Sequence, residues 1–206
     1  MSKADLLLGL QRVQNVVERR TTMPILSNAL LRAEKNGVSL SATDLEVGIQ
    51  SVLPGEIMEK GAITVKAKTL LDIVRELPEG SLRLQTKENN RLEVTAKKSV
   101  FNVVGLAAED FPEIPGFSTE EPNQFIRMNG TVLLSMLDKT LYAASMDEAR
   151  YHLNGVYFET VTQKDERYFR TVATDAHRLS LVDHKEALFE DQGWNLFKEG
   201  VIVPRK

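Results

Sequence analysis

The chain has 206 residues, of which 27% are charged and 42% are hydrophobic, and its formal net charge is −3. The small negative charge means that any nucleic-acid binding has to come from a local basic surface. The absence of cysteine excludes disulfides, thiolate metal sites and cysteine nucleophiles. No apolar run approaches the length of a membrane-spanning helix, and the charged N-terminal stretch is not typical of a signal peptide.

The first element predicted by the sequence is an amphipathic helix over residues 3–20. Its apolar stripe recurs at helical spacing and consists of Leu6, Leu10, Val13 and Val17. Short apolar runs separated by turn residues follow up to about residue 57, and the Lys-Asn-Gly sequence at 35–37 indicates a hairpin. These patterns predict a helix followed by antiparallel strands.

A second helix is predicted over residues 68–77, because an apolar stripe is followed by Pro78 and Gly80. Residues 81–106 alternate apolar and polar side chains in three short runs, which predicts a three-stranded antiparallel meander. The stretch 107–123 has no period, is rich in proline and acidic residues, and is interpreted as a connection between domains.

After this connection the pattern starts again, with a predicted helix over residues 131–145 and further strands from about residue 151. Leu7 precedes Asn28 by 21 residues, and Leu133 precedes Asn154 by the same interval. The sequence Ala-Thr-Asp ends at Asp44 in the first copy and at Asp175 in the second. We predict tandem domains of one fold, residues 1–121 and 122–206, the second ending before its second helix.

A cluster of polar residues in the second copy, Asp175, His177 and Arg178, has the composition of an active site. The first copy keeps the Thr-Asp pair but continues without histidine or arginine, so the aspartates are interpreted as turn residues that accept backbone N–H bonds. A small hydrolase using Asp175 and His177 is the alternative. This alternative lacks a recognisable nucleophile, because Ser180 does not stand in a sequence context typical of a catalytic serine.

Neither a metal nor a cofactor is expected. The candidate metal ligands His152, His177, Asp183 and His184 do not have the tight spacing of a metal site, and there is no glycine-rich phosphate loop. The basic residues on or beside the predicted helices form either an ordinary solvated face or a basic helical face that binds a partner; they are Arg12, Arg19, Arg20, Lys68, Arg75, Lys139 and Arg150.

Six motifs in order make the chain similar to one family, the bacterial DNA polymerase III beta subunit, the sliding clamp of replication. They are RRTTMPILSNALL, SATDLEV, AAEDFPEIP, ARYHLNGVYFE, VATDAHRLSLV and VIVPRK. The resemblance covers nearly the whole chain. It implies an α+β fold, the DNA clamp fold, in which tandem domains have antiparallel sheets outside and two helices on the inner face.

The resemblance also implies site residues. Arg20, Arg150 and Tyr151 are expected to contact the DNA backbone, and helix position adds Arg12, Lys68, Arg75 and Lys139 as candidates. A peptide groove is implied at Leu153, Thr174, Ala176, His177, Arg178 and Leu179, with Ala176 in place of a common glycine. The ring interface is expected at the edge of the last meander strand, around Phe101 and Val103.

By the same resemblance, the expected function is that of a cytoplasmic, non-catalytic processivity factor of the DNA polymerase III holoenzyme. Its expected partners are double-stranded DNA, the polymerase III catalytic subunit, the clamp loader, and repair polymerases with other clamp-binding proteins. The full-length parent is expected to be a homodimeric ring. This chain is expected to be a fragment of it, without the family's first strand and third domain.

Overall fold

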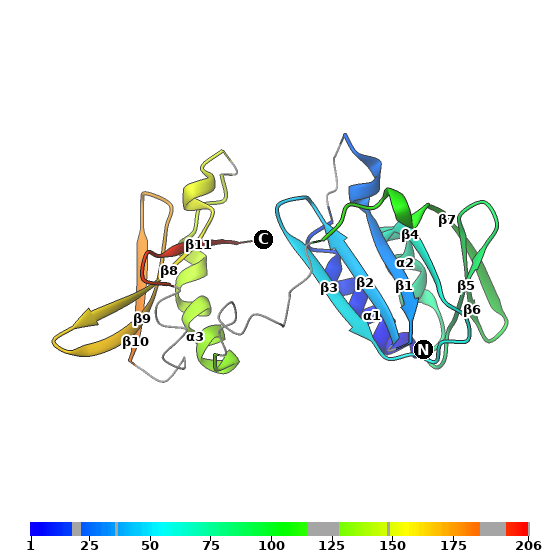
Figure 1. Ribbon diagram of the computed structural model, residues 1–206, viewed down its shortest axis with the longest axis horizontal. Helices are drawn as coiled ribbons and strands as arrows, with labels where there is room; N and C mark the ends of the chain where they lie inside the picture. The colour runs from blue at the N-terminus through cyan, green and yellow to red at the C-terminus, as the bar shows by residue number, and fades with distance from the viewer. Residues whose placement is uncertain (18–21, 36, 115–127, 148, 186–196, 206) are drawn as a thin grey trace. The chain divides into compact units, whose positions relative to one another are not determined.

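The computed structural model describes residues 1–17, 22–35, 37–114, 128–147, 149–185 and 197–205. The chain divides into two compact units, Met1–Gly116 and Phe117–Lys206 (Figure 1). The predicted domain boundary between residues 121 and 122 lies outside the described residues. No helix in the described parts of the chain is long and apolar enough to cross a membrane.

Unit 1 is built on a seven-stranded antiparallel sheet with the strand order β3-β2-β1-β4-β7-β6-β5. Its elements are α1 (Lys3–Val13), η1 (Pro24–Ser27), β1 (Asn28–Glu34), β2 (Gly37–Thr43), β3 (Gly48–Leu53), β4 (Gly61–Lys66), α2 (Ala67–Glu76), β5 (Arg83–Lys87), β6 (Arg91–Ala96), β7 (Ser99–Leu106) and η2 (Ala108–Asp110). The predicted hairpin at 35–37 and the predicted meander, here β5 to β7, are both confirmed.

Both helices of unit 1 lie on the same face of this sheet (Figure 1). Leu6 and Leu10 of α1 and Leu70 and Val74 of α2 are fully buried in one cluster with the inward-facing strand residues. The apolar stripes recognised in the sequence are therefore the faces that the helices bury on the sheet, as expected for a layered α+β unit.

Helix α1 is shorter than predicted. It begins where expected, with Ser2 Oγ accepting the Asp5 N–H at 3.1 Å, but it ends at Val13 instead of residue 20. Asparagine and β-branched valines follow, which are weak helix formers. The N–H groups of Val16 and Val17 both donate to the Val13 carbonyl, at 3.1 and 3.3 Å, so the chain continues as a turn in which Val16 is buried. Residues 18–20 of the prediction lie outside the described residues.

The opposite face of the unit 1 sheet carries a second layer. Ile25 and Leu26 of η1, with Ala108 and Phe111 beyond β7, form a cluster around Leu30 of β1. The start of the predicted domain connection is thus wrong in one respect. Residues 108–114 pack on unit 1, because Phe111 has an apolar strand face to cover and is only 7% exposed.

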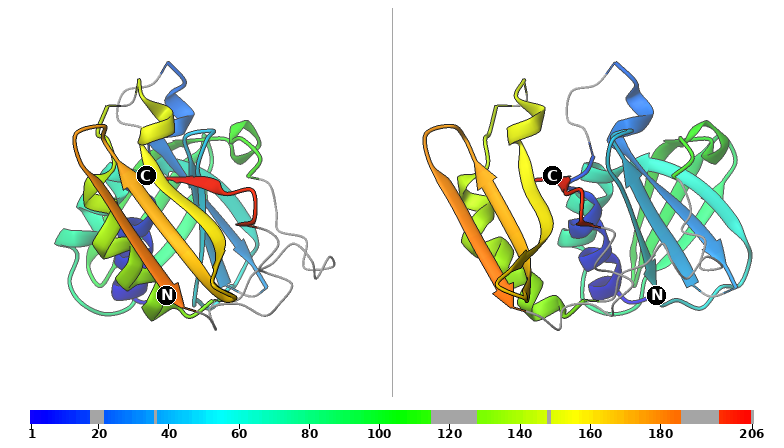
Figure 2. Two further views of the ribbon diagram at one scale, coloured as in Figure 1. Left: turned by 90° about the vertical axis from the view of Figure 1, so that its left-hand side faces the viewer. Right: turned by 60° about the vertical axis from the view of Figure 1, so that its left-hand side comes forward.

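In its described residues, unit 2 repeats the first half of unit 1 with one α-helix and four strands. Its elements are α3 (Gly130–Thr140), η4 (Leu141–Ala143), η5 (Tyr151–Leu153), β8 (Gly155–Gln163), β9 (Glu166–Thr174), β10 (Leu179–Lys185) and β11 (Val201–Pro204). The strand order β10-β9-β8-β11 corresponds to β3-β2-β1-β4, and α3 lies against one face of the sheet (Figure 2). The internal repeat is therefore a repeat of topology.

Strand register corrects the predicted equivalence by one residue. Leu31 pairs with Leu40 in unit 1, and Phe158 pairs with Thr171 at the corresponding place relative to the Thr-Asp turn. Counting back along both strands, Asn28 is equivalent to Gly155 rather than to Asn154. A shift by one residue would turn every side chain to the other face of the sheet, and the inward positions agree with the corrected register.

Helix α3 also ends earlier than the predicted residue 145. The Thr140 hydroxyl donates to the Met136 carbonyl at 2.9 Å, a local bond that competes with helix continuation. The chain then tightens into η4, which buries Ala143 completely. The apolar residues after Thr140 therefore enter the core of unit 2 from a different local structure than the one predicted.

Candidate functional site

The Thr-Asp turn of unit 1 is held by its own side chains. Asp44 Oδ1 accepts the backbone N–H groups of Glu46 at 3.0 Å and Val47 at 2.7 Å. The Thr43 hydroxyl accepts the Leu45 N–H at 3.0 Å and donates to the Val47 carbonyl at 2.9 Å. Leu45 has a positive φ of 79°, so the turn depends on these bonds to hold a backbone conformation that leucine rarely adopts.

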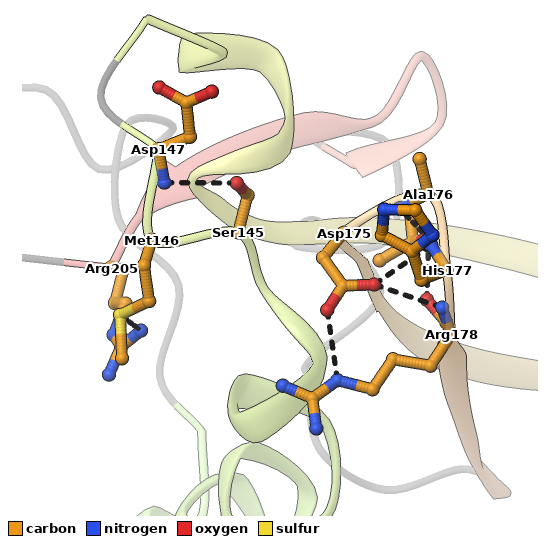
Figure 3. Close-up of polar contacts among 9 residues, drawn as sticks. Ser145, Met146, Asp147, Asp175, Ala176, His177, Arg178 and Arg205 are labelled. Carbon is orange, nitrogen blue, oxygen red and sulfur yellow. Dashed lines mark hydrogen bonds and ion pairs between the residues drawn. The ribbon is translucent and has the colours of Figure 1, made fainter.

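The Thr-Asp turn of unit 2 has the same set of bonds (Figure 3). Asp175 Oδ1 accepts the N–H groups of His177 at 3.0 Å and Arg178 at 2.9 Å. The Thr174 hydroxyl accepts the Ala176 N–H at 3.1 Å and donates to the Arg178 carbonyl at 2.7 Å, and Ala176 has a φ of 75°. The structural role assigned to both aspartates from the sequence is confirmed.

The Asp175 carboxylate is engaged by the backbone N–H groups of its own turn. Backbone N–H bonds from Arg178 and His177 hold the pKa of Asp175 below its ordinary value, because they stabilise the charged form. The contact to His177 is through that residue's backbone N–H. The Ser180 hydroxyl donates to the Lys139 carbonyl at 2.5 Å, so it serves the packing of α3 on β10.

The side chain of Arg178 is oriented from two sides. Its Nε donates to Asp175 Oδ2 at 3.0 Å, and its guanidinium carbon lies 5.6 Å from the centre of the Tyr142 ring. This distance is within the range of a cation–π contact. Sequence reasoning missed Tyr142, because it stands 36 residues before Arg178 in a turn that had been predicted as helix.

Five of the six predicted groove residues lie in one turn. Thr174 ends β9, Leu179 begins β10 opposite it, and Ala176, His177 and Arg178 are exposed between them. Leu179 is 63% exposed although it is apolar. The turn therefore presents a basic and an apolar side chain from a rigid scaffold.

Leu153, the sixth groove residue, ends η5 two residues before β8 begins. The pairing of Tyr157 with Val172 places the start of β8 and the end of β9 at the same end of the sheet. Leu153 therefore comes from the end of the sheet that carries the turn, and it is half-buried.

One of the candidate metal ligands, Asp183, is engaged in an ion pair. Asp183 receives two bonds from Arg170, at 2.7 and 2.9 Å, and Glu159 lies 3.4 Å from the same guanidinium. These carboxylates raise the pKa of Arg170, with the Asp183 hydrogen bond as the largest cause. No group of three potential ligands suited to a metal ion occurs among the described residues.

The basic residues predicted from helix position are all exposed where the structure describes them. Arg12 lies in the last turn of α1, Lys68 and Arg75 lie on α2, and Lys139 lies in the last turn of α3. Arg75 is 3.8 Å from Asp72, an exposed pair of little energetic weight. Arg19 and Arg20 lie outside the described residues.

Arg150 and Tyr151 stand at the start of η5, and both are exposed. Arg150 is 3.5 Å from Asp147. Tyr151 is 81% exposed and its ring meets His152 edge to face, with the ring centres 5.4 Å apart. A largely exposed tyrosine beside an arginine gives this corner of unit 2 a stacking surface and a cation.

The predicted ring-interface residues differ in burial. Strand β7 pairs with β6 along residues 99–104 but with β4 only at Gly105 and Leu106, so its first half has a free edge among the described strands. Phe101 is 39% exposed there. The Val103 side chain, in contrast, is buried in the core of unit 1, which restricts any part it takes in an interface to its backbone.

Comparison with known proteins follows the same division of the chain. The family model for the N-terminal domain of the DNA polymerase III beta subunit matches residues 1–115, and the model for its central domain matches residues 127–206. The beta sliding clamp of Caulobacter vibrioides is 43% identical over 209 residues, covering 100% of this chain and 54% of the relative. That of Vibrio cholerae is 35% identical over 208 residues, covering 100% and 53%.

Solved structures give the same answer. The DNA polymerase sliding clamp from Caulobacter crescentus has a TM-score of 0.85 at 41% identity, covering 100% of this chain and 54% of that one. The sliding clamp from Bartonella birtlesii bound to griselimycin has a TM-score of 0.85 at 40% identity, covering 100% and 53%. The chain spans about half the length of the relatives it matches. The resemblance found in the sequence is confirmed, and the chain belongs to the DNA polymerase III beta subunit family, matching its N-terminal and central domains.

Proposed function

We propose that this chain is part of a processivity clamp of bacterial DNA replication. The observation that carries the proposal is the repeat of one strand order in two consecutive units, which match the N-terminal and central domain models of one family. In the full-length protein, a ring built from such units encircles double-stranded DNA and tethers DNA polymerase III. The protein works in the cytoplasm as a non-catalytic subunit of the holoenzyme.

Contact with DNA is proposed for the exposed cations on the helices. A sliding ring needs no base recognition, and a few lysines and arginines facing the phosphates suffice. Arg12, Lys68 and Arg75 in unit 1 and Lys139 in unit 2 supply such charges, and Arg150 and Tyr151 supply a further contact. Arg20 is assigned the same role from the family resemblance.

The DNA proposal is tested with two matched double variants of the same chain. Lys68→Gln with Arg75→Gln removes two cations from α2, and Lys97→Gln with Lys98→Gln removes two exposed cations from the turn between β6 and β7. We expect the first pair to weaken binding to a labelled duplex at low salt and to reduce the salt-dependence slope by about one to two charges. Equal losses from both pairs would contradict a DNA-facing helical surface.

Tethering is proposed to use the groove at Leu153, Thr174, Ala176, His177, Arg178 and Leu179. The exposed leucine offers an apolar anchor, and Arg178, oriented by Asp175 and Tyr142, offers hydrogen bonds to an extended peptide. The occupants are short segments of the polymerase III catalytic subunit, the clamp loader, repair polymerases and other proteins with a clamp-binding motif. The solved relative from Bartonella birtlesii, a structure with bound griselimycin, supports ligand binding within the family.

The groove is tested by fluorescence polarisation with a labelled peptide ending in Leu-Phe. We expect weak binding to this chain, with a Kd of about 1 mM, and a loss of at least about tenfold for Leu179→Ala or Leu153→Ala. Leu134→Ala is the matched control, because Leu134 on α3 is 60% exposed against 63% for Leu179. A loss of binding in the control, or none in the groove variants, contradicts the proposal.

A homodimeric ring is proposed for the full-length protein, with the free edge of β7 as one side of the subunit interface. An unpaired strand edge with exposed apolar side chains tends to pair with another strand. We expect weak self-association of this chain, and we expect Phe101→Asp to reduce it. Sedimentation that shows a strict monomer at high concentration would count against this edge.

A further inference from the structure

Unit 1 has a cationic hollow at one end of its sheet, where the hairpin of β1 and β2 lies beside the start of β4. Its volume is about 600 Å³, which is within the range of small-ligand pockets. Three cations and one carboxylate line the hollow together with small residues. The lining residues are Arg32, Ala33, Glu34, Lys35, Lys60, Gly61 and Ala62. The hollow is therefore a positive site on a chain whose net charge is −3.

The arginine of the hollow lies on the sheet face opposite the helices. Leu31 is buried in the core beneath α1 and α2, whereas Leu30 is buried in the cluster on the other face. Because side chains alternate along a strand, Arg32 shares the face of Leu30. The hollow is thus separate from the helix cations that are proposed to contact DNA.

The equivalent row of unit 2 neutralises its own arginine. Arg170 on β9 is the cross-strand partner of Glu159 and Asp183. Its guanidinium lies 3.4 Å from the Glu159 carboxylate and 2.7 Å from the Asp183 carboxylate. Counting back along both strand pairs from the Thr-Asp turns, Arg32 corresponds to Glu159 and Ser39 corresponds to Arg170. The two units therefore place an arginine in the same row, but on different strands.

In unit 1 the row has no carboxylate opposite the arginine. Arg32 pairs with Ser39 on β2 and with Ala62 on β4. None of the ion pairs between described residues includes Arg32, Lys35 or Lys60. The side chain of Ala62 ends at Cβ, which leaves room beside the guanidinium. The three cations are therefore available to an anion from solution.

The composition of the lining selects the kind of anion. An arginine binds two phosphate oxygens at once through its planar fork, and each lysine adds a point charge. No aromatic or large apolar side chain is among the lining residues, so a nucleobase or an acyl group has no surface to pack on. We propose that the hollow binds a short chain of phosphate groups through Arg32, Lys35 and Lys60.

The probe is inorganic tripolyphosphate, titrated into the whole chain and followed by calorimetry and by backbone NMR shifts. We expect saturable binding at low salt with a Kd below about 1 mM, and NMR shifts centred on Gly61 and Ala62. Raising the salt to about 0.15 M should weaken binding at least about threefold, because the cations are exposed. Single phosphate should bind at least about tenfold more weakly than tripolyphosphate, and ATP should bind no more tightly.

Two kinds of protein variant locate the site. Arg32→Gln and Lys60→Gln should each weaken tripolyphosphate binding at least about fivefold, and Arg32→Lys should recover only part of that loss. Glu34→Gln removes the carboxylate that repels the ligand and should strengthen binding about twofold or more, an effect that misfolding cannot produce. Lys98→Gln is the matched control, because Lys98 is also an exposed cation of a unit 1 turn, and it should leave binding unchanged.

Three outcomes overturn the proposal. The first is an absence of saturable binding, and the second is a loss from Lys98→Gln equal to that from Lys60→Gln, which would mean that any surface lysine suffices. The third is that ATP or a single-stranded oligonucleotide binds much more tightly than tripolyphosphate with the same dependence on Arg32, which would make this a nucleotide or nucleic-acid surface. Lys68→Gln with Arg75→Gln should not affect tripolyphosphate, so the proposed DNA surface and the hollow can fail separately.

Discussion

The two units share one strand order but differ in what covers the strands. Ile63 and Val65 on β4 are buried beneath the helices, whereas Val201 and Val203, their register equivalents on β11, are about 40% exposed. Across the sheet, Leu30 is covered by η1 and residues 108–114, while Leu181 and Ile202 on the corresponding face of unit 2 are 45% and 42% exposed. Strand pairing can therefore be repeated without repeating stability, because stability depends on the layers that bury the sheet.

The largest effect is expected from the core of unit 2. Phe169 is 1% exposed and packs against Phe158 and Phe197, with ring centres 5.6 and 5.3 Å away. Phe169→Ala should lower the free energy of unfolding of unit 2 by about 3–5 kcal/mol. Because unit 2 has the smaller covered core, calorimetry should show two transitions, of which the first is the unfolding of unit 2. Phe169→Ala should move this first transition to a still lower temperature.

Leu70→Ala is the matched control in unit 1, since Leu70 is fully buried in that unit's core. It should lower the free energy of unfolding of unit 1 by about 2–5 kcal/mol, which moves the second transition to a lower temperature and leaves the first in place. A single transition that moves equally with either variant would mean that the two units unfold together, and the comparison between them would fail.

The two Thr-Asp turns allow the effect of burial on a hydrogen bond's contribution to stability to be measured, because their bonds are the same and their burial differs. Thr43 and Thr174 make the same two bonds, but Thr43 is buried and Thr174 is half-exposed. Thr43→Val removes the part-buried bond from the Leu45 N–H and buries a side chain that no longer bonds to the Val47 carbonyl, so it should cost about 1–2 kcal/mol, whereas Thr174→Val should cost less than about 1 kcal/mol. Serine at either position keeps the hydroxyl and should restore most of the loss in chemical denaturation.

Periodicity predicted the elements better than their ends. The apolar stripes located all three helices and the alternation located the meander, because a side chain's face follows from its spacing alone. The end of α1 at Val13 and of α3 at Thr140 depended on local turns that bury Val16 and Ala143, and such tertiary choices leave no periodic signal. For the same reason the contact between Arg178 and Tyr142 was not predictable.

The Thr-Asp turns were predictable from the repeat, because the first copy showed which part of the motif is turn structure. The groove role of residues 174–179 came from the family resemblance and stays a prediction. The corrected equivalence of Asn28 with Gly155 shows the limit of that method, since counting from a helix cannot detect one residue gained or lost in the loop before a strand. Register required the pairing itself.

A smaller, stabilising effect is expected from glycine in the two turns. Leu45 and Ala176 have φ values of 79° and 75°, a left-handed conformation that costs a non-glycine residue about 1–2 kcal/mol. Leu45→Gly and Ala176→Gly should each raise the free energy of unfolding by about 0.5 kcal/mol, because glycine's extra freedom in the unfolded chain offsets part of the gain. Ala62→Gly, on exposed β4 backbone without a positive φ, should lower it.

The smallest effect concerns pH. The folded pKa of Asp175 lies below its ordinary value, chiefly because of the N–H bonds from Arg178 and His177. Its contribution to stability is therefore fully present above the ordinary pKa and is lost as the pH falls through the lower, folded value.

Asp175→Asn keeps an oxygen for the backbone N–H groups but has no charge to titrate. Between about pH 5 and pH 3, the unfolding midpoint of unit 2 should fall further in the parent chain than in Asp175→Asn, while a carbon-detected NMR titration follows the carboxylate directly. Parallel falls in both proteins would mean that other carboxylates, such as Glu166 beside Lys185, control the acid response.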